Sequence, residues 1–356
     1  MKTSTDSSTG TPAVMAALGA AALFGASTPF AKQLVGELPA LLLAGLLYLG
    51  SGIGLLIARL LRDRGWRASG MTAAEWPWFA GAVVFGGMLG PVLLMLGLAY
   101  TSAGTASLLL NLEAVLTALL AWLVFRENAG ARIVLGMALI IAGGIVLSWS
   151  GENTAGNGWP GPLLIAGACL CWAIDNNLTR KVSASDALFI ASGKGLIAGA
   201  VNMALAFVLG AALPEWRVVA PAMLIGFLGY GVSLFLFVLA LRGLGTARTG
   251  AYFSTAPFIG AAIAILFFGE STTVPFWIAA ALMTAGVWLH LTERHAHRHT
   301  HETMAHEHAH THDEHHQHRH DFDWDGKEPH THPHRHAPIT HSHPHYPDIH
   351  HRHRHH

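Results

Sequence analysis

The sequence predicts an all-α polytopic membrane protein with a polar, histidine-rich tail. Of its 356 residues, 52% are hydrophobic and 12% are charged, whereas soluble globular proteins average about 25% charged residues. All 25 histidines lie at or after His290. The chain therefore consists of an apolar block that ends near residue 292 and a tail over residues 293–356, and this division excludes a soluble enzyme of uniform composition.

Ten apolar runs are each long enough to cross a bilayer as a helix, which takes about 20 residues. They cover residues 13–33, 39–61, 76–98, 103–125, 130–149, 161–180, 187–211, 218–241, 246–268 and 274–292. The first run is longer than the apolar core of a signal peptide, so we interpret it as a retained span that follows a short N-terminus, residues 1–12. Helices of a soluble bundle need polar outer faces, and stretches such as residues 38–56 and 133–147 have almost none.

The distribution of lysine and arginine predicts that both termini lie in the cytoplasm. With the N-terminus inside, eleven of these residues occupy inside positions and two, Lys32 and Arg217, occupy outside positions. Ten spans then return the tail to the cytoplasmic side of the cell membrane (inner or plasma). Acidic and basic residues number 21 each, so no net charge attracts nucleic acid. The expected partners are the lipid bilayer and a small-molecule substrate. The sequence does not decide between a monomer and a homodimer.

The apolar block is an internal duplication. The sequence LVFRE at 123–127 ends span four, and LFFGE at 266–270 ends span nine, at a shift of 143 residues. Phe24 in span one matches Trp172 in span six at a shift of 148 residues. The predicted parts are a first repeat over 13–149, an external linker over 150–160 and a second repeat over 161–292. Because five spans is an odd number, the second repeat is inverted, as in secondary transporters whose site lies between the repeats.

The run from Ser107 to Glu127, SLLLNLEAVLTALLAWLVFRE, followed by Leu135-Gly136, resembles the EamA repeat of the drug/metabolite transporter superfamily. The second repeat carries Pro257 and Phe268-Gly-Glu270 at the matching place. The resemblance covers roughly residues 13–292 and implies ten helices in two inverted EamA repeats. It implies transport but no particular substrate, because the superfamily moves amino acids, nucleotide derivatives, sugars, drugs and other metabolites. Such permeases usually lack a tail of this kind.

Charged residues inside the spans mark the candidate site, because a charge at the bilayer centre costs roughly 2.5–3.5 kcal/mol on insertion scales. Glu113 lies in span four, Asp175 and Asn176 in span six, and Lys194 in span seven. We expect Glu113 or Asp175 to carry a coupling proton, and Lys194 to be its counter-ion or the contact of an anionic substrate group. The alternative is a buried acid–lysine pair that only holds helices together.

Two further residues complete the predicted substrate and coupling-ion pathway. Thr28 is the repeat counterpart of Asn176, and Trp172 precedes Asp175 by three positions and shares its helix face. Glu127 and Glu270 end spans four and nine at opposite faces of the membrane. We interpret these two glutamates as helix-end residues that fix the turn into the next span, with gating as the alternative.

The tail is expected to be disordered and to bind divalent metal ions. It holds almost no Leu, Ile, Val or Phe, so it cannot bury a core. Repeated His-x-His units offer imidazole ligands suited to Zn, Ni or Co. The candidate ligands are His295, His297, His299, His301, His306, His308, His310, His312, His330, His332, His334, His336, His341, His343 and His345. The alternatives are a low-complexity expansion that binds metal incidentally and a pH sensor, because free histidine titrates near pH 6.5.

The sequence therefore favours a secondary transporter that moves a small metabolite by alternating access, with proton-coupled efflux as the expected mode and no required cofactor. The second hypothesis is a divalent metal transporter (Ni, Co or Zn) whose tail captures or senses the ion, although no histidine occurs in spans one to nine. A third is a metal-sensing membrane protein that transports nothing. An enzyme is disfavoured, because the chain has neither a nucleophile motif nor a phosphate-binding loop.

Overall fold

The structure, a computed structural model, describes residues 10–125, 131–149, 159–182, 185–292, 296–301, 304–310, 330–336 and 339–344. The chain divides into two compact units, Met1–Glu293 and Arg294–His356. Residues 1–9, most of the predicted linker over 150–160 and the predicted helix-end residue Glu127 lie outside the described residues.

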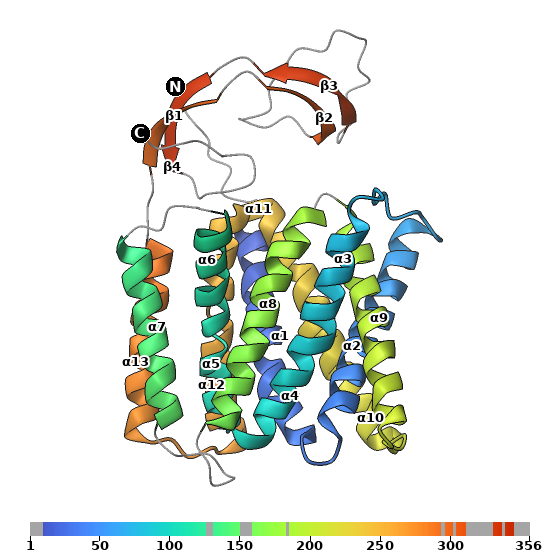
Figure 1. Cartoon of the computed structure of the whole chain (residues 1–356), viewed down its shortest axis with the longest axis vertical. Coiled ribbons are helices and arrows are strands. Elements are labelled where there is room, and N and C mark those ends of the chain that lie inside the picture. Colours follow the sequence, from blue (N-terminus) through green and yellow to red (C-terminus); the bar gives the residue numbers. More distant parts are fainter. Residues whose placement is uncertain are drawn as a thin grey trace. The chain divides into compact units, whose positions relative to one another are not determined.

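The first unit is a bundle of helices that run side by side (Figure 1). The first repeat contains α1 (Gly10–Leu34), α2 (Ala40–Asp63), α3 (Trp76–Ala82), the π-helix η1 (Val83–Leu89), α4 (Gly90–Tyr100), α5 (Ala103–Leu109), α6 (Leu112–Phe125) and α7 (Ala131–Trp149). The second repeat contains α8 (Pro160–Val182), α9 (Ala187–Val208), α10 (Trp216–Gly226), the π-helix η2 (Phe227–Val232), α11 (Ser233–Phe253), α12 (Ala256–Phe268) and α13 (Val274–Thr292).

Seven described helical segments are long and apolar enough to cross a membrane, which supports the predicted polytopic membrane unit. They are Pro12–Leu34, Ala40–Asp63, Trp76–Tyr100, Ala103–Leu120, Ala131–Trp149, Ala187–Val208 and Trp216–Ala240. Helices α8, α12 and α13 occupy the positions of predicted spans six, nine and ten. Helix α8 is less apolar because it carries Asp175, Asn176 and Asn177, and α12 is short. The count of ten spans therefore stays a prediction.

Helix α11 contains the turn between predicted spans eight and nine. Phe237 and Phe253 both belong to α11, yet their ring centroids lie 4.9 Å apart. Sixteen residues of straight helix would separate them by about 24 Å. Helix α11 is therefore strongly bent between these two residues, which lie on either side of the predicted boundary between residues 241 and 246.

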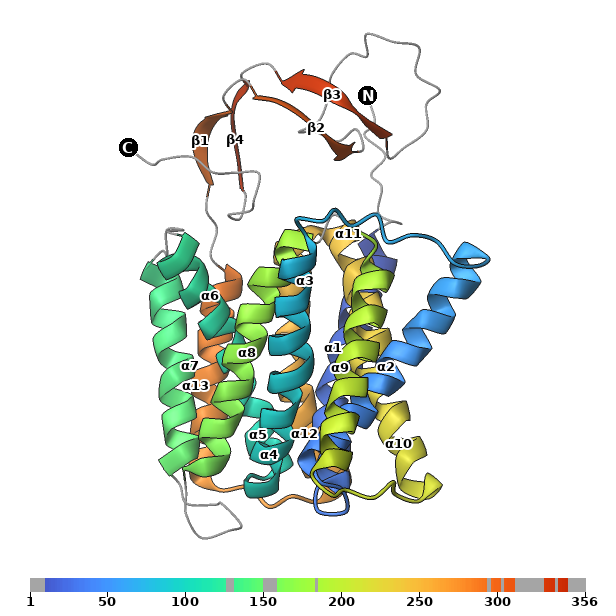
Figure 2. The ribbon, with the colours of Figure 1, turned by 45° about the vertical axis from the view of Figure 1, so that its right-hand side comes forward.

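The two ends of the bundle are distinct in their connections (Figure 2). Helix α1 begins and α13 ends at one end, which we call the first end, together with the connection from α2 to α3. The hairpin between α1 and α2 and the connection from α12 to α13 lie at the opposite, second end. The bundle thus returns the chain to the end at which it started.

The duplication is visible in the packing of α7 against α13. A Cβ atom on Gly143 would lie 3.0 Å from the carbonyl oxygen of Ala279, and a Cβ atom on Gly286 would lie 2.6 Å from that of Gly136. At the shift of 143 residues, Gly143 corresponds to Gly286, and Gly136 corresponds to Ala279. The same contact is therefore made twice, as two repeats related by a twofold axis require.

Helices α2 and α9 cross so closely that only glycine fits at the contact. A Cβ atom on Gly52 would lie 2.4 Å from the backbone nitrogen of Leu196, and one on Gly199 would lie 2.6 Å from that of Leu49. Because lipid tails are as apolar as leucine, close backbone packing rather than the hydrophobic effect holds such helices together.

The second unit contains β1 (Ala296–His301), β2 (Met304–His310), β3 (His330–His336) and β4 (Ile339–Pro344). Strand β1 pairs with β4 and β2 pairs with β3, both antiparallel. The sequence predicts a tail without regular structure over residues 293–356, and the structure differs from this prediction in having these strands. Strict His-x-His alternation has the two-residue period of a strand, so it is compatible with pairing even without a hydrophobic core. The predicted ligands His295, His312 and His345 lie outside the described residues.

The packing predicts that Gly226→Ala destabilises the bundle. A Cβ atom there would lie 1.9 Å from the carbonyl oxygen of Leu47 on α2, and overpacking typically costs about 1–3 kcal/mol. Gly250→Ala is the matched control, because a Cβ atom on Gly250 meets nothing within 4 Å. We expect a lower midpoint of thermal unfolding in detergent for the first variant alone. Equal midpoints for the two variants would contradict this account of the packing.

Candidate functional site

The predicted pair of charges is formed inside the bundle. The Nζ atom of Lys194 on α9 donates to the Oδ2 atom of Asp175 on α8 at 2.5 Å, and the two side chains are 13% and 8% exposed. The hydroxyl group of Thr179 donates to the other carboxylate oxygen at 2.9 Å. Burial of two charges is tolerated only where they are paired and hydrogen-bonded, and both conditions are met here.

The π-helix η1 exposes a backbone carbonyl beside this pair. The N–H group of Gly90 donates to the carbonyl oxygen of Phe85, five residues earlier, which is the π register. In the same register the donor to the Gly86 carbonyl would be Pro91, which has no N–H group. The freed Gly86 carbonyl accepts instead from the hydroxyl group of Tyr48 at 2.6 Å and from the Nε1 atom of Trp172 at 3.1 Å. Two side chains from other helices thereby fix the shape of η1.

Glycine at position 86 is required by the close approach of the carboxylate. A Cβ atom on Gly86 would lie 2.0 Å from the Oδ2 atom of Asp175. Any larger residue would therefore displace the carboxylate from Lys194 or push η1 away from α8.

Aromatic rings from both repeats pack next to the ion pair. Phe24 on α1 contacts Trp172, Tyr230 and Phe253, with centroid separations of 6.5, 6.0 and 5.4 Å. Tyr230 lies in η2 and also contacts Tyr48 at 5.5 Å. Phe24 and its repeat counterpart Trp172 therefore meet each other between the repeats, in an edge-to-face arrangement that aromatic quadrupoles favour.

Glu113 lies in a second polar cluster, on the other side of α8. The amide nitrogen of Asn176 donates to the Oε1 atom of Glu113 at 2.9 Å and approaches the hydroxyl oxygen of Thr117 at 3.5 Å. Glu113 stands in the first turn of α6, where the helix dipole favours a negative charge. It also lies in electrostatic range of Asp175 and Lys194. The two clusters meet through the neighbouring residues Asp175 and Asn176.

Span four is broken just before Glu113, contrary to the single continuous helix over 103–125 that the sequence predicts. Helix α5 ends at Leu109 and α6 begins at Leu112. Asn111 lies in the break, 3% exposed, and its side-chain amide donates to the carbonyl oxygen of Leu108. The second repeat has the matching break between α11 and α12. Half-helices that end near the midplane are a recurrent feature of transporter sites.

Most of the predicted pathway residues are brought together. Glu113, Asp175, Asn176, Lys194 and Trp172 all belong to the two clusters or contact them. Thr28 is 1% exposed on α1, and the described contacts do not join it to either cluster. The structure adds four residues that the sequence did not single out as site residues: Gly86, Tyr48, Thr179 and Thr117. The Gly-Gly pair shortly before Pro91 was the sequence signal for η1.

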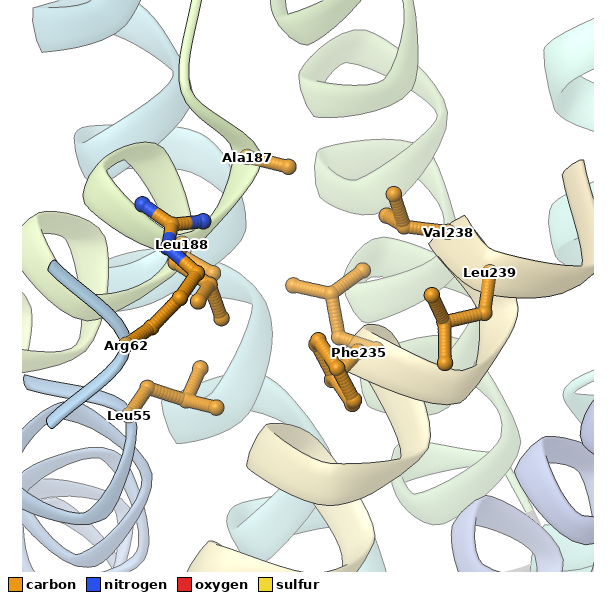
Figure 3. A pocket seen from close by; sticks show the side chains of 9 residues that line it. Leu55, Arg62, Ala187, Leu188, Phe235, Val238 and Leu239 are labelled. Carbon is orange, nitrogen blue, oxygen red and sulfur yellow. The ribbon is translucent and has the colours of Figure 1, made fainter. Parts of the chain in front are cut away.

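A cavity of about 220 Å³ lies away from both clusters, between α2, α9 and α11 (Figure 3). Leu55, Leu188, Phe235 and Leu239 contribute apolar side chains, and Arg62 contributes its guanidinium group. That group is already bonded to Asp63 and Asp186. We therefore place the candidate site at the ion pair and its aromatic neighbours rather than in this cavity.

Asp186 joins the end of α2 to the start of α9 at the first end. Burial by itself raises the pKa of this carboxyl group, but hydrogen bonds from Arg62, Arg59 and the Leu188 N–H outweigh it and lower the pKa to about 2. Arg59 is 1% exposed and lies 5.1 Å from the ring centroid of Phe189. This network is structural, because each of its charges already has a partner.

Within the part of the chain whose side chains are described, no group of three or more His, Cys, Asp or Glu residues could hold a metal ion. Cys169 and Cys171 are free and buried. The candidate site in the described part of the bundle therefore consists of the ion pair and its aromatic neighbours.

The ion pair predicts a large effect of Asp175→Asn. Removal of the carboxylate leaves the Lys194 ammonium buried without its partner, which typically costs about 3–5 kcal/mol. We expect a lower thermal midpoint in detergent, and a double variant with Lys194→Met should recover much of the loss. A double-mutant cycle measures the coupling, and purely additive effects of the two substitutions would show that the pair contributes nothing to stability.

Comparison with known proteins agrees with this architecture. The profile of the EamA-like transporter family matches residues 11–149 and 159–292. An uncharacterized transporter of Methanothermobacter thermautotrophicus is 30% identical over 211 residues, which span 57% of this chain and 60% of that protein. A solved crystal structure superposes with a TM-score of 0.59 at 20% identity, covering 78% of this chain and 94% of that chain, a likeness that shows the fold alone. Two profile matches, one on each repeat, establish that the chain belongs to the EamA-like transporter family.

Proposed function

We propose that the protein is a secondary transporter with ten membrane spans that moves a small organic metabolite by alternating access, as proton-coupled efflux from the cell. The observation that carries this proposal is the buried Lys194–Asp175 pair, whose carboxylate packs against Gly86 of η1. Charges at bilayer depth are retained mainly where they act on a substrate or an ion. The seven apolar segments support a membrane location, and we propose α8, α12 and α13 as the remaining spans.

The ion pair offers both charges to a polar solute. An anionic group of the substrate competes with Asp175 for Lys194, while a cationic or hydrogen-bonding group competes with Lys194 for Asp175. The rings of Phe24, Trp172 and Tyr230 lie next to the pair and supply apolar contacts. Binding then exchanges one set of charge-assisted hydrogen bonds for another, so neither charge is left unpaired.

Glu113 is the proposed proton carrier. Its described hydrogen-bond partner is the neutral amide of Asn176, whereas Asp175 is bonded directly to the Lys194 ammonium. A carboxylate without a direct cationic partner gains most from binding a proton when water leaves the site. The contact with Asn176 also links the first repeat to the second, so protonation of Glu113 acts at the interface that must move.

Both termini are proposed to lie in the cytoplasm. The first end of the bundle carries the start of α1, the end of α13 and the arginines that follow α2. Basic residues concentrate on the cytoplasmic side of membrane proteins. The second end would then face outwards.

The proton carrier is tested by Glu113→Gln. A growth screen of cells with and without the protein, over metabolites, drugs and metal salts, first identifies a transported compound. In proteoliposomes we then expect wild-type transport of that compound to vary with pH, and transport by Glu113→Gln to lose this dependence, because the amide cannot exchange a proton.

Glu215→Gln is the matched control, because Glu215 is an exposed carboxylate in the connection between α9 and α10. It should keep the wild-type pH profile. A wild-type profile in Glu113→Gln as well would reject Glu113 as the carrier and leave Asp175 as the candidate.

A second candidate function is capture of a divalent ion, Zn, Ni or Co, by the tail, favoured by the strand register. In the pair of β2 with β3, His306 stands opposite His334, and His308 stands opposite His332. In the pair of β1 with β4, His299 stands opposite His341. Opposite residues in antiparallel strands have Cβ atoms about 4.5–5.5 Å apart, a spacing that lets two imidazoles share one ion.

Deletion of residues 294–356 tests this second function. We expect the full chain to bind several Ni or Zn ions in equilibrium dialysis and the shortened chain to lose them, because imidazole is the ligand that these ions share. Cells that express the shortened chain should show altered metal tolerance while transport of the organic compound persists. Equal metal binding by both chains would exclude the tail as the binding site.

A further inference from the structure

Glu270 ties the two repeats together at the second end of the bundle. Its two carboxylate oxygens accept from the backbone N–H groups of Ala103 and Gly104, each at 2.7 Å. Glu270 follows α12 in the second repeat, whereas Ala103 and Gly104 begin α5 in the first repeat. The contact therefore spans the interface across which alternating access must separate the repeats.

The surroundings of Glu270 are shaped to receive a carboxylate. Ser102 caps α5 through Thr105, so the N–H groups of Ala103 and Gly104 have no partner in their own helix and depend on Glu270. A Cβ atom on Gly104 would lie 3.1 Å from the Oε2 atom of Glu270 and 3.4 Å from the ring of Phe276. Glycine thus leaves room for the carboxylate to reach both donors.

Helices α1 and α4 are joined at the same end. Lys32, near the end of α1, donates to the carbonyl oxygen of Leu98 on α4. Lys32 also lies in electrostatic range of Glu270. Helices of both repeats therefore meet around Glu270 and Lys32 at the second end.

Deeper in the same interface, α5 packs tightly against α1 and α12. Ser107 is 1% exposed, and a Cβ atom on Gly260 would lie 2.7 Å from its hydroxyl oxygen and 2.6 Å from the carbonyl oxygen of Gly25. Ser107 is therefore covered where α5 packs against α12, and movement of α5 away from α12 would expose it. Ser107 therefore reports whether this end is open.

We propose that the Glu270 carboxylate is a latch that holds the second end of the pathway shut, and that its release from Ala103 and Gly104 opens this end. The inference rests on alternating access as the proposed function. It differs from a role as a mere helix-end residue, because a latch controls access to the interior and a helix end controls only stability. Release of the latch breaks only hydrogen bonds, so opening is reversible.

The latch is tested by cysteine labelling in the full chain, with Cys169 and Cys171 replaced by alanine and Ser107→Cys introduced. A membrane-impermeant maleimide is added from the side of the second end. We expect slow labelling with Glu270 present and labelling at least about tenfold faster with Glu270→Gln, since loss of a charge-assisted hydrogen bond is worth about a factor of ten or more. Glu270→Asp, which keeps the charge but has a shorter reach, should give an intermediate rate.

Glu37→Gln is the matched control, because Glu37 is an exposed carboxylate in the hairpin between α1 and α2, at the same end. Its labelling rate should equal that of the parent. Hydrogen exchange of the backbone amides of Ala103 and Gly104 is measured in a background without Ser107→Cys. There it should be faster in Glu270→Gln and unchanged in Glu37→Gln. Unchanged labelling and exchange in Glu270→Gln, or a lower thermal midpoint without faster labelling, would overturn the latch.

The test needs no substrate. If Glu270→Gln opens the second end but no transported compound is ever found, the latch stands and the proposed transport function fails. If a compound is transported but Glu270→Gln labels at the parent rate, the transport function stands and the latch fails.

Discussion

The bundle depends on one electrostatic constraint, that a lysine and an aspartate placed at bilayer depth must remain paired. Lys194 and Asp175 lie on α9 and α8, so the pair fixes these two helices against each other. Glycine at position 86 lets η1 approach the carboxylate, and the π register turns a backbone carbonyl towards Tyr48 and Trp172. The carbonyl that the π register frees at Gly86 is stabilised because it accepts from these two side chains.

The same constraint explains why the polar residues divide into two clusters. A single helix, α8, carries Asp175 towards η1 and α9, and Asn176 towards Glu113 on α6. Successive residues of a helix project about 100° apart, so one polar stretch can serve two faces. Movement of α8 against the first repeat therefore changes the contact of Asn176 with Glu113 and that of Asp175 with Gly86 together. The two clusters are thus coupled through one helix.

Much of this architecture was predictable from the sequence, and the reasons for the rest are physical. The duplication is visible because the LVFRE and LFFGE stretches preserve spacing, and charges in apolar runs stand out because burial is costly. The break before Glu113 was missed, since Asn111 alone interrupts a continuous apolar run. The π-helix η1 was missed because the Gly-Gly pair before Pro91 is a weak signal on its own, and the donors that complete the register, Tyr48 and Trp172, come from distant parts of the chain. For the tail, alternation of histidine carries a strand period that an argument from composition ignores.

The duplication supplies a symmetric frame, but the charge within it is asymmetric. Gly86 and Gly229 correspond at a shift of 143 residues, and each faces the helix that begins the other repeat. A Cβ atom on Gly86 would meet Asp175, whereas one on Gly229 would meet Ser27, 2.4 Å from its Cβ atom. Ser27 and Asp175 correspond at the shift of 148 residues that also relates Phe24 to Trp172. The backbone therefore presents two equivalent positions, of which only the one at Gly86 faces a charge, so the polarity of the interior is asymmetric although the frame around it is twofold.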